Sequence, residues 1–593
     1  MHSQKVHYLI FSLLLLAVTA IWLTVNSHWN PGTWRSPGGN PSGDILEVAA
    51  RVQIAAEQFP RLHNTYGSID RLGAPVGACW TSYPTPDRVT FALAGLISRV
   101  VGVFGAINFL MLVGHLLGAS SFYFCTRLLK WHPALGAAGA LLFSYAVFNQ
   151  QWSGTLSLSW TFTLPPAVVL LQWIASRSAT PPSASRCRMA WLAAGTGLCL
   201  GFGNPYFVFA VLQLLLFALL FQWYRNRAYA RLRVGVIFLL ALLLVFFLSH
   251  APYFFAHFIA DEVDAIGRNY AGSELYALKP IELFLPPKSH RIDAMAALGR
   301  NYSRITFFRS TEPIGSYLGL VGILGFVVIV FALLKSAVAS RRKYLPVPDA
   351  TLATLWILFL SCVGGMNSML SFLSLDLFRA SNRFSILVFI WCLFAAIGWM
   401  RRQTIRQQPR WTYIFSAVIA TIGLFDLVPH GLSQSHHEAG TTWLSSERSI
   451  AARIVQAGGS GAKVFQLPAV PFPEAGLVLG FPDYDHLRLF LASPELKLSY
   501  GGLRGSLPER WNRWAAGLPA RALVEELEQC GFSVLTIDQR AYQPYAFTQL
   551  TVDLHAAGLS PVALPESSHL IAFRLTPSAT PKSPEPNDPR FYP

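Results

Sequence analysis

Long apolar stretches, separated by short polar segments, make up the first 430 residues of the chain. A helix of about 20 apolar residues is long enough to cross the hydrocarbon core of a bilayer. The first stretch follows Lys5 and lacks the small residues of a cleavage site, so we interpret it as a retained span. We predict eleven spans, at residues 8–25, 106–126, 133–148, 154–175, 189–203, 205–223, 234–257, 316–334, 351–373, 384–400 and 411–428.

The segment at residues 89–105 is also apolar, but Arg99 interrupts it, so it fits either a span or a helix lying at the membrane surface. The charges between the spans favour the surface helix. If the segment does not cross, the loops on the N-terminal side of the membrane hold 18 basic residues and one acid, Asp349. Cytoplasmic loops carry an excess of Lys and Arg, so we predict a cytoplasmic N-terminus and an extracytoplasmic C-terminal part. The basic residues are Lys5, Arg127, Lys130, Arg177, Arg186, Arg188, Arg225, Arg227, Arg231, Arg233, Lys335, Arg341, Arg342, Lys343, Arg401, Arg402, Arg406 and Arg410.

From about residue 430 the pattern changes to short alternating segments, which predict a small α/β domain over residues 430–577. The last residues, 578–593, are rich in proline and are predicted to be disordered. The predicted fold class is therefore mainly α, a polytopic membrane helical bundle over residues 1–429 with a C-terminal extracytoplasmic α/β domain. Within that domain we predict helices at 446–458, 520–531 and 544–558, and strands at 463–468, 532–539 and 569–576.

The composition agrees with a membrane protein, since 13% of the residues are charged against about 25% in soluble domains. The net charge of +16 reflects the cytoplasmic loops and does not indicate nucleic-acid binding. Seven cysteines without CxxC or zinc-type spacing indicate neither a disulfide framework nor a metal site, although a Cys79–Cys530 pair on the outer side remains open. No GxGxxG segment opens a helix after a strand, so a nucleotide site is not supported.

Polar residues on the predicted outer side gather in two long loops, residues 26–105 and 258–315. In the first loop Asp44 begins a predicted helix whose apolar residues recur at helical spacing, so one helix face is expected on the membrane interface. Asp44 is then either a helix cap, since Asp is a preferred N-cap residue, or a carboxylate that acts on a lipid-linked substrate. The loop alone leaves both alternatives open.

Arginines on the outer side run against the charge bias of membrane proteins and therefore need a reason. Arg379 and Arg383 lie four residues apart at the head of a span, on one helical face, and Arg268 and Arg291 lie in the second loop. A guanidinium group binds phosphate through two parallel hydrogen bonds. We interpret these four arginines as ligands of a lipid phosphate; the alternative is that they extend to lipid headgroups.

Four short motifs follow one another along the chain. They are GD at residues 43–44, a pattern N…G.P.G…W…P..D from Asn64 to Asp87, FRASNRF at 378–384, and VFQLP…FPE at 464–474. In their order they resemble the GT-C superfamily of membrane glycosyltransferases, and within it the YfhO-like bacterial membrane proteins. The resemblance covers most of the chain, and it implies a GT-C-like membrane domain.

The resemblance further implies that a sugar is transferred from a polyprenyl-phosphate donor to an extracytoplasmic glycan, lipid or protein, at the outer face of the bacterial inner (plasma) membrane. Asp44 falls on the position of the general base, and His63, Asn64 and Asp87 are expected to bind substrate. Ile45 follows Asp44 where many GT-C enzymes have a second acid, which favours a metal-free mechanism. No cofactor is expected, and a divalent metal remains open.

Two other function classes compete with a transferase. A transporter or flippase of lipid-linked sugars would use the same arginines without a base, but transporters usually carry polar residues at mid-membrane, and the predicted spans hold few. A non-catalytic assembly protein would use the outer α/β domain for interactions. In the transferase, we expect that domain to recognise the acceptor or to cover the cavity, and to carry no catalytic residue.

Overall fold

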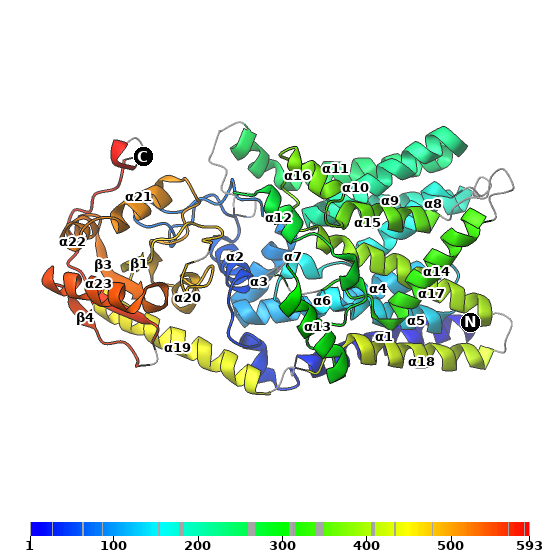
Figure 1. Cartoon of the computed structure of the whole chain (residues 1–593), viewed down its shortest axis with the longest axis horizontal. Helices are drawn as coiled ribbons and strands as arrows, with labels where there is room; N and C mark the ends of the chain where they lie inside the picture. Colours follow the sequence, from blue (N-terminus) through cyan, green and yellow to red (C-terminus); the bar gives the residue numbers. More distant parts are fainter. Residues whose placement is uncertain are drawn as a thin grey trace.

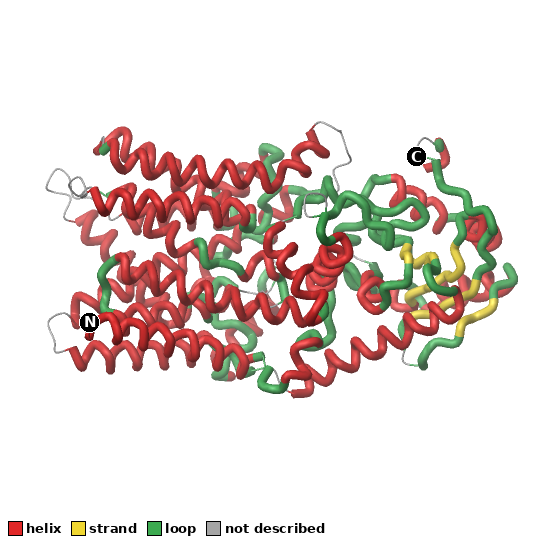
Figure 2. The backbone as a smooth tube through the Cα atoms, turned by 180° about the vertical axis from the view of Figure 1, so that it is seen from behind, coloured by secondary structure: helices red, strands yellow, loops and turns green. Residues whose placement is uncertain are grey.

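The chain folds into a bundle of long helices and, beyond one end of the bundle, a smaller domain that contains the five-stranded sheet (Figures 1 and 2). The computed structural model describes residues 2–26, 28–61, 65–85, 87–151, 154–176, 183–226, 228–258, 267–307, 312, 315–338, 349–404, 409–431, 434–476, 478–566, 568–585 and 588–591. The predicted fold class, a polytopic helical bundle with a C-terminal α/β domain, is confirmed.

Eight helical segments within the described residues are long and apolar enough to cross a membrane, and they coincide with eight of the eleven predicted spans. A helix makes its backbone hydrogen bonds within the segment, as the bilayer requires, and the apolar side chains of these segments suit a lipid environment. The helices that form these segments are α1 (His2–Val25), α4 (Val103–Leu128), α7 (Leu156–Ser159) with α8 (Leu164–Ala175), α10 (Pro205–Phe221) with η3 (Gln222–Asn226), α11 (Tyr229–Phe258), α14 (Gly319–Val338), α17 (Ser385–Thr404) and α18 (Pro409–Leu427).

The other three predicted spans are helical but shorter or less apolar. The span at 133–148 forms the 12-residue α5 (Pro133–Ser144), followed by the short α6 (Val147–Gln151). The span at 351–373 is divided into α15 (Asp349–Ser361) and α16 (Met366–Phe372). Gly364 between them has a φ of +69°, a conformation that ends a right-handed helix and that glycine adopts readily.

The third of these helices, α9 (Ser183–Phe202), packs closely along α11. A Cβ atom at Gly197 would lie 2.8 Å from the carbonyl oxygen of Phe238, and one at Gly201 would lie 2.7 Å from that of Leu242. The two glycines are four residues apart and so share one helix face. They allow the two backbones to approach, as small residues do between membrane helices.

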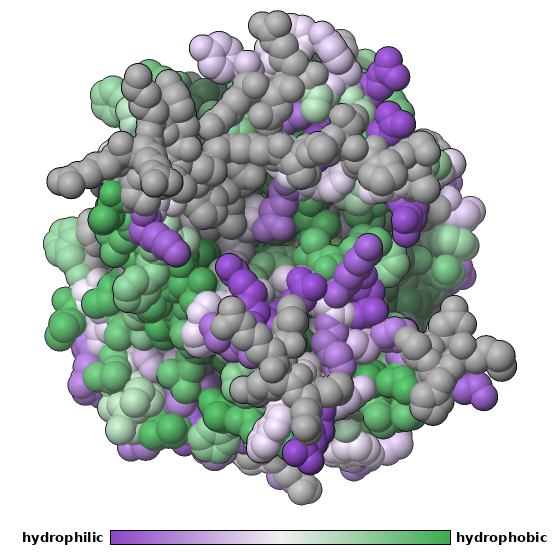
Figure 3. All heavy atoms as spheres, turned by 90° about the vertical axis from the view of Figure 1, so that its right-hand side faces the viewer, coloured by the Kyte–Doolittle hydropathy of each residue, from purple (hydrophilic) through white to green (hydrophobic). Residues whose placement is uncertain are grey.

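The two ends of the bundle differ in what they carry. The N-terminus lies at the end far from the C-terminal domain (Figure 1). Viewed from that end, hydrophilic side chains gather near the middle of the surface, with hydrophobic side chains around them (Figure 3). The N-terminus and the C-terminal domain thus lie at opposite ends of the bundle, which agrees with the odd number of spans predicted from the sequence.

Short helices cover the end of the bundle next to the C-terminal domain (Figure 1). They are η1 (Pro31–Arg35), α2 (Asp44–Gln58), α3 (Arg88–Val101), α12 (Tyr270–Leu275), η4 (Pro280–Leu283), α13 (Asp293–Ile305) and η6 (Ser381–Phe384), together with α16. Most of them come from the two predicted outer loops; η6 ends at the start of the predicted span 384–400, and α16 lies within the predicted span 351–373. Helix α3, which corresponds to the predicted surface helix, has 14 residues and is therefore shorter than a span.

The apolar face of α2 was expected on the membrane interface, and this expectation is wrong. The face is buried in protein, because α2 packs between α3 and the C-terminal domain. A Cβ atom at Gly95 of α3 would lie 2.7 Å from that of Ala55, which shows how closely the two helices approach. Apolar spacing identifies a buried face, but it does not distinguish lipid from another part of the same chain.

The C-terminal domain has a five-stranded sheet in the order β2-β1-β3-β5-β4, in which β2, β1 and β3 are parallel while β5 and β4 run antiparallel to their neighbours. The strands are β1 (Lys463–Leu467), β2 (Lys497–Leu498), β3 (Phe532–Asp538), β4 (Ser560–Val562) and β5 (Leu570–Arg574). The helices are α19 (Gln434–Gly458), α20 (Leu487–Ala492), α21 (Leu507–Ala516), α22 (Ala520–Gln529), η7 (Gln539–Ala541), α23 (Pro544–Ala556) and η8 (Pro589–Phe591).

The first outer loop joins this domain through its backbone. Leu498 donates to the carbonyl of Arg71 at 2.8 Å, and Ala74 donates to the carbonyl of Leu498 at 2.9 Å. Gly501 follows with a φ of +102°, and a Cβ atom there would lie 2.9 Å from that of Leu72. Strand-like pairing therefore attaches the domain to the same loop that carries α2.

The tail at 578–593, expected to be disordered, packs onto the domain in its described part. Ser578 and Lys582 donate backbone hydrogen bonds to the carbonyls of Glu528 and Gln529. Phe591 is buried against Trp514, with 5.3 Å between the ring centroids. One aromatic side chain and a few backbone bonds anchor a segment whose composition alone indicates disorder.

Candidate active site

A cavity of about 590 Å³ lies where the outer helices, the end of the bundle and the C-terminal domain meet. Its wall combines Asp44, Glu47 and Arg51 of α2 with the first residues of α10, the segment before α17, and side chains of the C-terminal domain. The predicted site residues that line it are Asp44, Arg268, Arg379 and Arg383. Residues more than 300 positions apart in the chain are thus brought to one place.

Asp44 is the first residue of α2 and does not cap it. Gly43 occupies the N-cap position with a φ of +58°, and no side chain caps the helix. The Asp44 carboxylate accepts no hydrogen bond from the described residues and faces the cavity. Of the two alternatives that the loop left open, the helix cap is therefore excluded.

The environment of Asp44 favours its protonated form. Asp44 is exposed on the wall of the cavity, but protein atoms surround its carboxyl group closely enough to reduce its solvation. This burial is the main reason why the pKa of Asp44 is raised to about 6; the negative charge of Glu47 raises it further, while Arg383 acts in the opposite direction. A carboxylate whose pKa lies near the working pH accepts and releases protons efficiently.

Glu47 lies one turn from Asp44 and is held by a buried arginine. Arg51, 1% exposed, binds the Glu47 carboxylate through Nε and donates from Nη1 to the Thr85 hydroxyl at 2.6 Å. Four aromatic rings, each with its centroid within 6 Å of the guanidinium carbon, surround it. This fixed cation keeps Glu47 in place beside Asp44. The rings are those of Tyr66, Trp80, Tyr83 and Phe91.

Both predicted phosphate ligands at the head of α17 are engaged by carboxylates. Arg379 forms a two-pronged ion pair with Glu474 of the C-terminal domain, with Nη2–Oε1 at 2.6 Å and Nη1–Oε2 at 3.1 Å. Arg383 pairs with Glu312, whose second oxygen accepts from Asn382 at 3.0 Å. A carboxylate presents two oxygens to a guanidinium in the same fork that a phosphate presents.

Arg268 lines the same cavity and forms no ion pair with any residue that the structure describes. Its Nε is buried and without a hydrogen-bond partner among those residues. Arg504 of the C-terminal domain also lines the cavity, and donates to the Glu474 carbonyl at 2.8 Å. A ligand with negative charge thus meets several guanidinium groups on one side of the cavity.

Two further predicted site residues, Arg291 and Asp87, are described by the structure and do not line this cavity. Arg291 donates to the carbonyl of Val428 at 2.6 Å and lies over the Phe425 ring, so it fastens the second loop to the C-terminal end of α18. Asp87 is buried and caps α3, accepting from the Thr90 amide at 3.2 Å. His63 and Asn64 lie outside the described residues.

Several wall residues were not predicted from the sequence. Glu312 and Glu474, the partners of the two arginines, are the main ones. Glu474 ends the FPE motif, but no spacing relates it to Arg379, because the pair joins two parts of the fold that are 95 positions apart. The available signal was the outer arginines themselves, since a half-buried guanidinium needs a carboxylate partner.

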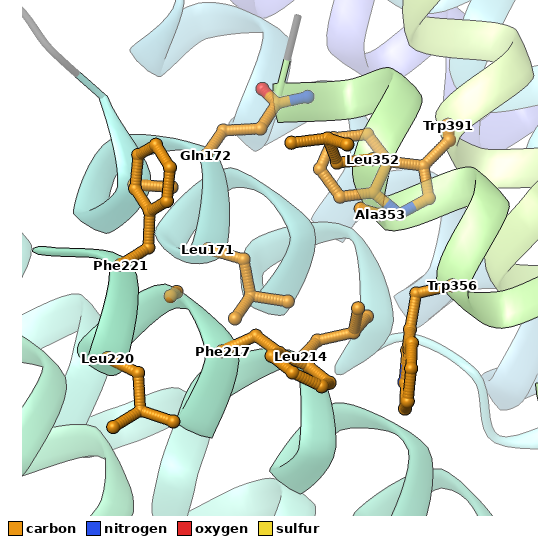
Figure 4. A pocket seen from close by; sticks show the side chains of 12 residues that line it. Leu171, Gln172, Leu214, Phe217, Leu220, Phe221, Leu352, Ala353, Trp356 and Trp391 are labelled. Atoms are coloured by element: carbon orange, nitrogen blue, oxygen red, sulfur yellow. The ribbon is translucent and has the colours of Figure 1, made fainter. Parts of the chain in front are cut away.

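A second cavity, of about 410 Å³, lies within the bundle between α8, α10, α15 and α17 (Figure 4). Its wall is formed by hydrophobic side chains and Gln172, and it holds no titratable group. It has space for an apolar chain, but its wall carries no side chain that could act as an acid, a base or a nucleophile. Among the described residues, no group of three or more His, Cys, Asp or Glu side chains is arranged to hold a metal ion.

No protein-family model matches the chain, and no curated protein sequence matches it either. Among solved proteins, the chain is similar to ArnT from Cupriavidus metallidurans, in two crystal structures. The one bound to undecaprenyl phosphate has a TM-score of 0.46 and 11% identity, and the apo form has a TM-score of 0.40 and 13% identity. Each match covers 97% of this chain and 99% of the other.

Proposed function

We propose that this protein is a membrane glycosyltransferase of the GT-C type, which moves a sugar from a polyprenyl-phosphate donor to an extracytoplasmic glycan, lipid or protein. The observation that carries the proposal is the Asp44 carboxylate, without a hydrogen bond to the described residues, in a cavity that also holds Arg268, Arg379 and Arg383. A base and a set of phosphate ligands are the two features that this reaction requires. The motifs that resemble the YfhO-like proteins add support from the sequence.

In the proposed reaction Asp44 accepts the proton of the acceptor hydroxyl as its oxygen attacks the anomeric carbon of the donor. The bond from that carbon to the phosphate oxygen breaks, and the polyprenyl phosphate leaves with the electron pair. Its growing negative charge is stabilised by the guanidinium groups that line the same cavity. Direct attack with a single base inverts the anomeric centre.

The placement of the cavity fits a substrate with one end in the membrane. It is lined by residues of α10 and α11, which belong to the membrane bundle, and by residues of the C-terminal domain. A lipid-linked donor reaches it from the bilayer, whereas an acceptor reaches it from the side of the domain. We assign the site to the outer face of the bacterial inner membrane, in line with the excess of Lys and Arg in the opposite loops.

The test is the Asp44→Asn variant, purified and supplied with a polyprenyl-phosphate sugar and an acceptor. Transfer should fall by about a hundredfold or more, because general base catalysis contributes factors of this size, while binding of polyprenyl phosphate persists. Asp293→Asn, which removes an exposed carboxylate outside the cavity, is the control and should transfer normally. Full transfer by Asp44→Asn, with a correctly inserted protein, would contradict the proposal and favour a transporter of the same lipid.

A further inference from the structure

The ion pair between Arg379 and Glu474 joins the head of α17 to the C-terminal domain. Of the two ion pairs in this part of the cavity it is the more exposed: the side chains are 24% and 39% exposed, against 17% and 13% for Arg383 and Glu312. It is also the pair whose acid belongs to the domain. A ligand that enters the cavity can therefore compete for Arg379 more readily than for Arg383.

Glu474 lies in a short loop that aromatic and backbone contacts of Phe472 hold in place on its N-terminal side. Phe472, two residues earlier, stacks on Trp80 of the first outer loop with 4.4 Å between the ring centroids, and its carbonyl accepts from the Arg504 amide at 2.7 Å. Glu474 itself has a φ of +58°, which is unfavourable for a residue with a side chain. Its contacts to Arg379 and to the Arg504 guanidinium hold it there.

Two arginines contact Glu474, one through its carboxylate and one through its backbone carbonyl. Arg379 and Arg504 contact it directly, and Gly267, next to Arg268, lies near the Arg504 guanidinium, with 3.7 Å from a Cβ position there to Nη1. A single carboxylate in such surroundings occupies a place where a more highly charged anion binds better. The polyprenyl phosphate that leaves, a monoester with up to two negative charges, is such an anion; the phosphodiester of the proposed donor carries one charge, like the carboxylate, and offers Arg379 the same fork of two oxygens.

We propose that Glu474 occupies, in the donor-free protein, the place on Arg379 that the donor phosphate takes, so that the C-terminal domain keeps the donor site closed until the lipid binds. This inference rests on the proposed function. Binding of the phosphate exchanges one ion pair for another at Arg379 and releases Glu474 with its loop. Donor binding is thereby coupled to the part of the domain that faces the acceptor side.

The experiment measures the affinity of the purified full-length protein for a polyprenyl monophosphate. Glu474→Gln should bind about two- to fivefold more tightly than the wild type, because the lipid no longer competes with an ion pair of this strength. Glu57→Gln is the matched control: it removes the carboxylate of another arginine–glutamate ion pair, that with Arg71, which lies outside the cavity, and its affinity should be unchanged. In an Arg379→Ala background the effect of Glu474→Gln should disappear.

A second measurement does not depend on a variant. Hydrogen exchange in residues 470–476 of the wild type should become faster when polyprenyl phosphate binds, and Arg379→Ala should not show this change. If Arg379→Ala weakens binding but Glu474→Gln weakens it too or leaves it unchanged, Glu474 only orients Arg379; the inference is then wrong and the proposed function stands. If Arg379→Ala binds as the wild type does, both the inference and the phosphate site fail.

Discussion

At the scale of single residues, the proposed transfer activity depends on the protonation state of Asp44. Its pKa is raised to about 6, first by burial and then by the charge of Glu47. The base must be ionised to accept a proton, so activity should be present above about pH 6 and fall as the pH decreases through that value. The quantity to measure is kcat/KM for transfer as a function of pH, which reports the free protein.

The contribution of Glu47 gives this prediction a second variant. Glu47→Gln keeps an oxygen that accepts from Arg51 but removes the negative charge beside Asp44. The pKa of Asp44 should decrease, and the acid limb of the pH profile should move to lower pH. Thermal unfolding of the variant serves as the control for folding. An acid limb that stays in place would mean that another group controls the rate.

Two arginines of the second outer loop allow a direct comparison of positions inside and outside the cavity. Arg268→Ala should weaken the binding of polyprenyl phosphate about ten- to a hundredfold, since a hydrogen bond to a charged group contributes about 1.5–3 kcal/mol. Arg291→Ala should leave that affinity unchanged, because Arg291 binds the backbone carbonyl of Val428, just after α18. Equal losses in the two variants would argue that only long-range charge is being measured.

The sequence alone drew attention to those candidate site residues whose type or position along the chain is unusual in itself. The outer arginines run against the charge bias of membrane proteins, and Asp44 begins a predicted helix shortly after the first span, so they attract attention without a structure. Glu312 and Glu474 do not, because an acid in an outer loop is ordinary. Their function depends on pairing across the fold, and a single sequence holds no record of that pairing.

At the scale of elements, the packing of α9 on α11 leads to a prediction with a control on the same helix. Gly201→Ala would place a methyl group 2.7 Å from a backbone oxygen of α11, and overpacking of this kind costs about 1–3 kcal/mol. A Cβ atom at Gly195 would meet nothing within 4 Å. Gly195→Ala should therefore be neutral or slightly stabilising. Thermal unfolding in detergent compares the two, and equal melting temperatures would contradict the packing.

The sequence predicted those elements whose apolar pattern and turn residues lie within the element itself. β1, β3, β5, α22 and α23 were predicted to within about two residues, because each has its own apolar pattern and turn residues. β2 has only two residues and was missed. Helix α19 was predicted from residue 446 but begins at Gln434, since its polar first half is stabilised by contacts with other parts of the chain, such as that between His437 and Asn26.

At the scale of the whole molecule, the C-terminal domain forms part of the site. It contributes Glu474, Asp483, Tyr484 and Arg504 to the cavity wall. The first outer loop is hydrogen-bonded to its sheet, and α19 runs from the bundle to the domain (Figure 1). Covering of the cavity, one of the two tasks expected of the domain, is therefore supported by its position. A catalytic base within the domain is not needed for the proposed reaction.

The orientation in the membrane is the last prediction, and two native cysteines test it. The structure places the N-terminus and the C-terminal domain at opposite ends of the bundle, while the excess of Lys and Arg assigns the N-terminal end to the cytoplasm. Cys79, in the first outer loop, and Cys187, at the start of α9, are both exposed and unbridged. A membrane-impermeant thiol reagent should modify Cys79 in cells whose inner membrane is intact, and Cys187 only after that membrane is permeabilised. Cys79→Ser and Cys187→Ser identify each signal. The reverse order of labelling would invert the topology and place the cavity, with Asp44, on the cytoplasmic side.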